Sequence, residues 1–168
     1  RAEDVGYAPT HRLYLPMSGV ITNSEREVIG ALAVTELLRG GVTTILEMEE
    51  DAELFAPFIA SSGIRAFIGV MVNDVNLDAL ASGQTVFDDT VRTQQLSQAI
   101  GLAERWHGRS GGRIQAVMAA NGLSMSSPAL LKGLRAAADD LGLRVSIHLG
   151  FGERELVESV HHRAQFDY

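Results

Sequence analysis

The sequence predicts an α/β fold in which helices alternate with the strands of a parallel sheet. Four short runs rich in β-branched and apolar residues indicate buried strands, at residues 42–48, 64–72, 113–120 and 145–149. A helical pattern follows each run, and helices between successive strands favour right-handed crossovers and parallel pairing. Four strands cannot close a barrel of eight. The alternatives are therefore a compact open sheet, or about four βα units of a larger barrel.

The first helix is predicted after an irregular segment, residues 1–23, that shows neither helical nor strand periodicity. Ser24 and Glu27 form the capping-box pattern S-x-x-E in front of an apolar stripe. The members of that stripe recur at helical spacing: Val28, Ile29, Leu32, Ala33, Thr35 and Leu38. Gly40 and Gly41 then end the helix.

Turn and cap residues delimit the later elements. Helix 52–62 contains Pro57 and is closed by Gly63. A polar excursion over 76–90 leads to helix 91–107, whose inward side is expected to carry Leu96, Ile100, Ala103 and Trp106.

The last βα units begin at a second cap. Ser127 and Pro128 are typical of a helix start, and helix 128–141 should bury Leu130, Leu131, Leu134 and Ala138. The final strand, 145–149, leads through Gly150 and Gly152 to a helix over 153–164.

Composition narrows the classes of protein and of partner. The 168 residues suffice for a single domain, and 46% hydrophobic with 21% charged residues is ordinary for a soluble globular chain. A net charge of −7 with Lys132 as the only lysine argues against a nucleic-acid surface and a P-loop. Without cysteine, any metal must be held by His, Asp or Glu. There is no long apolar run and no signal peptide at the start, so we expect a cytoplasmic protein without a membrane partner.

His148 is the first candidate for a catalytic or metal-binding role, because it lies at the carboxyl end of a predicted strand. Ligands and catalytic groups gather at the carboxyl ends of parallel strands, and imidazole can bind a metal or transfer protons. The alternative is a structural histidine whose nitrogens are satisfied by a neighbouring strand. Acidic residues, Glu47, Glu49, Glu50 and Asp51, also crowd a predicted strand end. They could do acid/base work, or they could simply form a solvated loop before a helix.

Four sequence segments resemble the amidohydrolase superfamily, especially its cytosine deaminase-like and triazine chlorohydrolase-like branch. They are A-V-T-E-L-L-R-G-G-V-T-T-I-L-E-M (33–48), S-G-I-R-A-F-I-G-V (62–70), M-S-S-P-A-L-L-K-G-L (125–134) and D-L-G-L-R-V-S-I-H-L (140–149). Their order and spacing agree with the second to fifth βα units of that family's TIM-type barrel. The resemblance implies that the chain is a single-domain part of a larger (β/α)8 hydrolase.

The resemblance also implies site residues. His148 matches a strand-end ligand of the catalytic metal, zinc or iron, and Asn121 stands where the family often has a substrate-contacting histidine. The family acid three residues after the ligand is replaced by Phe151, with Glu153 nearby, so Glu153 and Glu47 are the candidate acid/base groups and Phe151 a substrate contact. The family's H-x-H pair is absent, because His11 stands alone in the leading segment. His161 and His162 are expected to be surface residues of the last helix.

The resulting hypothesis is a metal-dependent hydrolase whose activated water attacks a C–N or C–Cl bond of a small heterocyclic or amide substrate. Because one ligand is too few for a metal site, this chain alone is expected to be inactive. The alternative is a non-catalytic fragment or a degenerate α/β binding domain. Exposed sheet edges further predict association, with a second copy or with further segments of a parent chain.

Overall fold

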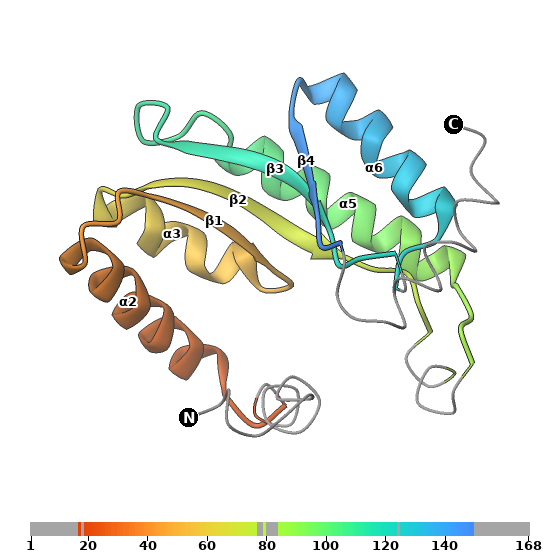
Figure 1. Cartoon of the computed structure of the whole chain (residues 1–168), viewed down its shortest axis with the longest axis horizontal. Helices are drawn as coiled ribbons and strands as arrows, with labels where there is room; N and C mark the ends of the chain where they lie inside the picture. Colours follow the sequence, from red (N-terminus) through yellow and green to blue (C-terminus); the bar gives the residue numbers. More distant parts are fainter. Residues whose placement is uncertain (1–16, 18, 77–78, 80–83, 124, 150–168) are drawn as a thin grey trace.

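A four-stranded parallel sheet forms the centre of the molecule. The computed structural model describes residues 17, 19–76, 79, 84–123 and 125–149 (Figure 1). The strands are β1 (Thr44–Glu49), β2 (Arg65–Val72), β3 (Ile114–Ala120) and β4 (Arg144–Ile147), and they lie side by side in the order β1-β2-β3-β4. Every neighbouring pair is parallel. The predicted parallel sheet is therefore confirmed, and its sequential order contains no switch point.

Three helices cover one face of this sheet: α3 (Ala52–Ser62), α5 (Asp89–Trp106) and α6 (Pro128–Leu141) (Figure 1). The core between them takes alternate residues of the strands: Ala66, Ile68, Val70 and Val72 of β2, and Ile114, Ala116, Met118 and Ala120 of β3. We call this the helix face. The intervening residues, such as Phe67 and Val117, form the open face. The guanidinium of Arg144 lies 5.5 Å from the centroid of the Phe67 ring, which places β4's first residue on the open face too.

The first helix, α2 (Asn23–Arg39), corrects the predicted cap. The N-cap is Thr22, which is extended at φ −73° and ψ 159°, and Glu25 completes the capping box. The Thr22 amide donates to Glu25 Oε2 at 2.8 Å, and the Glu25 amide donates to Thr22 Oγ1 at 3.4 Å. Ser24 already lies in the first helical turn. The cap is therefore the motif T-x-x-E, two residues before the predicted S-x-x-E, because Thr22 has the extended backbone that a cap requires and Ser24 is already helical.

The apolar stripe of α2 does not face the core. Val28, Ile29 and Leu32 are 69%, 53% and 58% exposed, and Val34 is the buried residue of the helix. The helix instead approaches α3 at Gly30, where an added Cβ would lie 2.6 Å from Phe55 Cδ1. The close approach needs a residue without a side chain, and it turns the stripe outward.

The other helices follow the prediction closely. Helix α3 contains Pro57, and Gly63 ends it in the left-handed conformation at φ 91°. Helix α5 begins two residues earlier than expected, since Asp88 caps it by accepting from the amides of Thr90 and Val91. Its buried residues are Ala99, Leu102 and Ala103, with Leu96, Ile100 and Trp106 at the edge of the core. Helix α6 has the predicted bounds, the Ser127 cap and buried Leu130, Leu134 and Ala138.

The excursion after β2 has a short paired base. Val75 bridges Phe87 in antiparallel fashion, and the amide of Asp88 donates to the carbonyl of Asp74 at 2.8 Å. The predicted helix over 153–164 and the leading residues 1–16 lie outside the described residues. Among the described helices, none has the length and apolar character needed to cross a membrane.

Candidate functional site

The candidate site is built where the four parallel strands end. The strands end at Glu49, Val72, Ala120 and Ile147, and the polar residues that follow are Glu50, Asn73, Asn121 and His148. We call these four residues the rim. The carboxyl ends of parallel strands share one edge of a sheet, which brings together residues that lie far apart in the sequence.

The register places three rim residues in one row. Val72 pairs with Ala120, and Ala120 pairs with Ile147, so the next residues along each strand are Asn73, Asn121 and His148. The amide of Asn121 continues the ladder by donating to the carbonyl of Val72 at 3.0 Å. Val72, Ala120 and Ile147 pack toward the helix face, so alternation directs the three rim residues toward the open face. His148 is exposed, one residue beyond the end of β4.

Glu47 lies on the opposite side of the sheet. It pairs with Ile68, which is fully buried under the helices, whereas its neighbour Leu46 pairs with Phe67 on the open face. The structure therefore does not bring Glu47 together with Asn121 and His148. Burial, and secondarily the charge of Glu49, raises the pKa of Glu47 to about 7. Its Oε1 atom is buried without a hydrogen-bond partner among the described residues.

Asn73 is a rim residue that sequence reasoning missed, and Glu50 was recognised only as one of four acidic residues near a strand end. The Asn73 side-chain amide donates to Glu50 Oε1 at 3.3 Å, and Asn73 is only 8% exposed. The position of Asn73 directly after the predicted strand 64–72 was visible in the sequence. Glu50 reaches the rim because β1 ends at Glu49, one residue later than predicted, whereas Glu47 lies inside the strand on the helix face.

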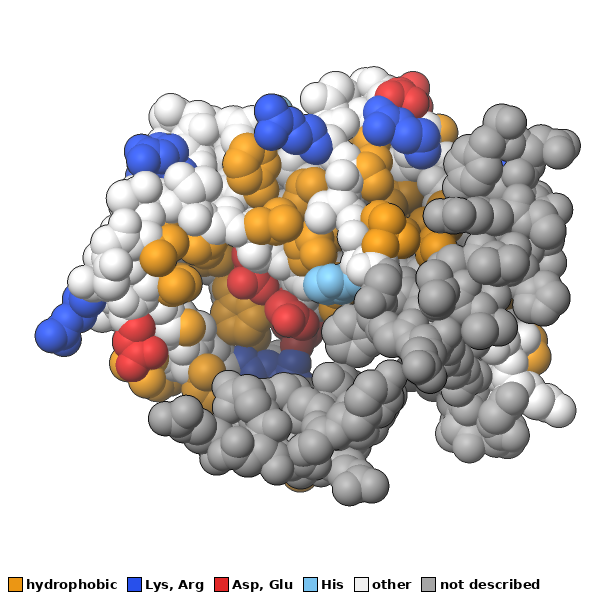
Figure 2. All heavy atoms as spheres, in the orientation of Figure 1, with side chains coloured by type: hydrophobic (Ala, Val, Ile, Leu, Met, Phe, Trp, Pro, Cys, Tyr) orange, Lys and Arg blue, Asp and Glu red, His pale blue; other side chains and the backbone are white. Residues whose placement is uncertain are grey.

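The acidic end of β1 interacts electrostatically with His148. Burial and the nearby Glu50 carboxylate raise the pKa of Glu49, while His148 and Arg26 oppose that rise. Figure 2 shows acidic side chains and a histidine gathered beside hydrophobic side chains that lie over the sheet.

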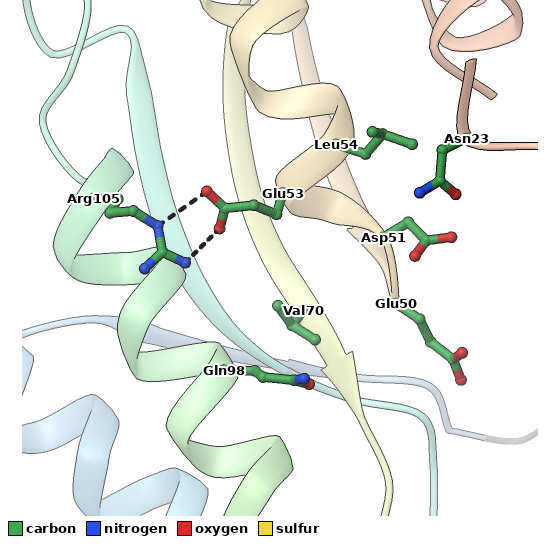
Figure 3. A pocket seen from close by; sticks show the side chains of 8 residues that line it. All are labelled: Asn23, Glu50, Asp51, Glu53, Leu54, Val70, Gln98 and Arg105. Carbon is green, nitrogen blue, oxygen red and sulfur yellow. Dashed lines mark hydrogen bonds and ion pairs between the residues drawn. The ribbon is translucent and has the colours of Figure 1, made fainter. Parts of the chain in front are cut away.

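One cavity lies beside the rim and shares Glu50 with it. It has a volume of ≈ 470 Å³ and is lined by Asn23, Glu50, Asp51, Glu53, Leu54, Val70, Gln98 and Arg105 (Figure 3). Its acidic groups already have partners. Glu53 accepts from Arg105 at 2.7 Å and 3.0 Å, Asp51 pairs with Arg26, and Glu50 accepts from Asn73. Only Glu50 connects this cavity to the rim, so we do not assign the site to it.

The described residues do not complete a metal site. Within the ranges that the structure describes, no group of three His, Asp or Glu side chains could hold a metal ion. His148 supplies one imidazole, and a zinc site needs about three protein ligands. The candidates Phe151 and Glu153, and also His161 and His162, lie outside the described residues.

Comparison with known proteins identifies the family. The sequence pattern of the amidohydrolase family matches residues 7–166. The chain belongs to the amidohydrolase family. One curated relative is a 5-methylthioadenosine/S-adenosylhomocysteine deaminase of Symbiobacterium thermophilum, 29% identical over 77% of this chain and 27% of the relative. Another is a 5'-deoxyadenosine deaminase of Methanobrevibacter smithii, 29% identical over 91% of this chain and 33% of the relative. The chain thus spans a third or less of the length of these amidohydrolases.

Solved structures support the same fold. An atrazine chlorohydrolase of Arthrobacter aurescens, crystallised with zinc and atraton, gives a TM-score of 0.73 at 15% identity and covers 92% of this chain and 36% of its own. An adenosine deaminase of Xanthomonas campestris with bound zinc gives a TM-score of 0.72 at 21% identity, and the match covers 95% of this chain and 34% of the deaminase. These structures confirm that the four βα units have the fold of part of a TIM barrel. At such identities the likeness shows the fold alone.

Proposed function

We propose that this chain forms part of a metal-dependent hydrolase that deaminates an adenine nucleoside. The names of the curated relatives carry the proposal, since they are deaminases of 5-methylthioadenosine, S-adenosylhomocysteine or 5'-deoxyadenosine. In hydrolytic deamination, water adds to the ring carbon that bears the amino group. The C–N bond then breaks, ammonia leaves, and the ring keeps the oxygen of the water.

The rim residues suit parts of this chemistry. His148 is exposed on the open face at a strand end, where we propose that it is one ligand of a divalent metal, zinc or iron. Asn121, next to it in the row, carries both a donor and an acceptor, which can pair with the ring nitrogens and the amino group of a purine. The described residues do not complete a metal site, so we assign no reaction step to the metal.

The acid/base group is proposed from two carboxyls. Glu153 lies outside the described residues, near Phe151, for which we propose a substrate contact. Glu47 has a pKa near neutrality, as general acid/base catalysis requires, but it lies on the helix face. Glu153 is therefore the better candidate.

A second candidate is a non-catalytic protein that keeps the scaffold. This alternative is favoured by the absence of a three-ligand cluster among the described residues. We expect little or no metal binding and no turnover from the 168-residue chain by itself.

A chimera separates the two functions. The segment of the Methanobrevibacter smithii deaminase that this chain matches is replaced by this chain, and conversion of 5'-deoxyadenosine is followed by chromatography and ammonia release. We expect deamination, and we expect His148→Ala to lower metal content and to reduce turnover at least about a hundredfold, since one of about three protein ligands is lost.

His107→Ala is the matched control. His107 accepts a hydrogen bond from the amide of Ala116 at 3.2 Å and lies at the other end of the strands. The His107→Ala substitution should therefore leave the metal content of the chimera unchanged. A folded, metal-loaded chimera that leaves the nucleoside intact would contradict the proposed function and favour the non-catalytic alternative.

A further inference from the structure

Asp74 is a fully buried carboxylate one residue beyond the rim. Its side chain is 0% exposed. Both of its oxygens accept from one residue: the Ser127 amide donates to Asp74 Oδ1 at 2.7 Å, and the Ser127 hydroxyl donates to Oδ2 at 2.5 Å. Arg92 Nη1 lies 3.8 Å from Oδ2 and supplies the nearby positive charge. A buried carboxylate persists only with such partners.

The backbone of Asp74 is bonded as completely as its side chain. Its amide donates to the carbonyl of Met125 at 3.1 Å, and its carbonyl accepts from the amide of Asp88 at 2.8 Å. One residue at the end of β2 thus contacts the base of the following excursion and the loop that connects β3 to α6.

The β3–α6 loop, residues 121–127, is attached to β2 at both of its ends. At its start, the amide of Asn121 donates to the carbonyl of Val72, and at its end Ser127 is bound by Asp74. Between these points the chain turns at Gly122, whose φ of 139° is rarely open to residues with a side chain. Strand pairing holds the first attachment, whereas the second depends on the Asp74 side chain.

The Ser127 hydroxyl links this loop to helix α6. It donates to Asp74 and accepts from the amide of Leu130 at 3.0 Å, so it caps the helix while it is held by the carboxylate. Loss of the Asp74 carboxylate would leave a buried amide and a buried hydroxyl without acceptors, which the loop can relieve only by moving toward water.

We propose that Asp74 is a positioning residue of the candidate site: its carboxylate holds the loop 121–127, and with it Asn121, against the end of β2. This inference rests on the proposed function, in which Asn121 lies beside the substrate. Asp74 itself touches neither Asn121 nor a reacting atom and acts through Ser127.

Native-state amide hydrogen exchange on the 168-residue chain tests the positioning without substrate. The reporters are the amides of Asn121, Met125 and Ser127, each of which donates a hydrogen bond in the structure. Asp74→Ala should speed their exchange at least about tenfold more than that of α3, because local opening exposes only the segment that has lost its anchor. Asp74→Asn, which keeps one acceptor and one donor in place, should restore most of the protection.

Ile59→Ala is the control for a purely structural loss. Ile59 is 1% exposed in α3, so its truncation destabilises the core without touching the loop. In the Ile59→Ala chain, amide exchange should therefore become faster in all elements alike. A second check is Ser127→Ala, which combined with Asp74→Ala should add little at the amides of Asn121 and Met125, because the hydroxyl–carboxylate bond is already lost. Its additional effect should appear at the amide of Leu130, which loses the Ser127 hydroxyl as its cap.

The inference is overturned if Asp74→Ala speeds exchange uniformly, as Ile59→Ala does, or not at all. The chimera tests the function separately. Absence of nucleoside turnover there would count against the proposed deamination, whereas a local rise in exchange would still establish Asp74 as the anchor of the Asn121 loop.

Discussion

At the scale of single residues, Glu47 shows how burial changes a carboxyl group. It lies in a central position of β1 on the helix face, and burial raises its pKa to about 7. A group with this pKa in the folded chain and its ordinary value of 4.5 in the unfolded chain binds its proton more tightly when folded. The contribution of Glu47 to stability is therefore greatest below the unfolded pKa and is lost as the pH rises from 4.5 to about 7.

The pH dependence gives the residue-scale prediction. The free energy of unfolding should fall by roughly 1–2 kcal/mol between pH values of about 4.5 and 7.5, after allowance for the solvent that still reaches Glu47. Glu47→Gln should remove most of this decrease and should stabilise the chain at the higher pH. Urea unfolding at both pH values measures it.

Glu27→Gln provides the comparison, because it makes the same change on the exposed surface of α2. Glu49, whose pKa is also raised, should leave part of the pH dependence in place. Equal slopes in the wild-type and Glu47→Gln chains would show that Glu47 is not the group responsible.

At the scale of elements, capping residues mark where the helices begin. Apolar periodicity is a poorer guide to which side of a helix is buried. Three helices start at a residue whose side chain accepts from the first turn: Thr22, Asp88 and Ser127. The cap is a local hydrogen-bond motif and is therefore readable in sequence. The outward stripe of α2 depends on the distant contact between Gly30 and Phe55, which is not local.

The capping box of α2 is testable by two neighbouring substitutions. Thr22→Ala should destabilise the chain by about 1 kcal/mol, because it removes the acceptor of the Glu25 amide. Ser24→Ala, at the position that the sequence pattern alone would make the cap, should change the free energy of unfolding by at most a few tenths of a kcal/mol, because alanine is the better helix former within the first turn. Thermal or urea unfolding compares the two. A larger loss for Ser24→Ala would place the cap at Ser24 instead.

At the scale of the whole molecule, the described part of the sheet has two edge strands and one face without covering helices. Among the described strands, β1 and β4 have one neighbour each, and the face opposite the helices leaves Leu46 52% exposed. Unpaired strand edges beside exposed apolar surface favour pairing with another chain. The relatives have about three times this length. In a TIM barrel, further strands pair with both edges of such a sheet and close it.

We therefore predict that the isolated chain self-associates at micromolar concentration. Leu46→Lys should shift it toward the monomer, because a charge on the open face opposes burial of that face against a second copy. Val28→Lys places the same charge on the exposed stripe of α2, where Val28 is 69% exposed, and should change association less. Analytical ultracentrifugation distinguishes these outcomes. A monomeric wild-type chain with cooperative unfolding would contradict the prediction.

Several features were determined by the sequence itself. The short β-branched runs, the Ser127-Pro128 helix start and the Gly63 stop are local signals, and they located all four strands and the helices α3 and α6. Parallel sequential pairing followed from the alternation of strands and helices, which leaves few topologies. The parity of His148 relative to Ile147 predicted that it faces away from the helices, and His148 is exposed one residue beyond β4.

The tertiary structure alone decided which polar groups meet. Glu47, Glu49 and Glu50 are close in sequence, and one residue of strand alternation determines which faces the helices and which reaches the rim. The pairing of Asp74 with Ser127 spans 53 positions in the chain, and no local pattern reports it. Strand ends and loop contacts arise from packing between elements distant in sequence, so side-chain partnerships at the site emerge only when the sheet and its helices are assembled.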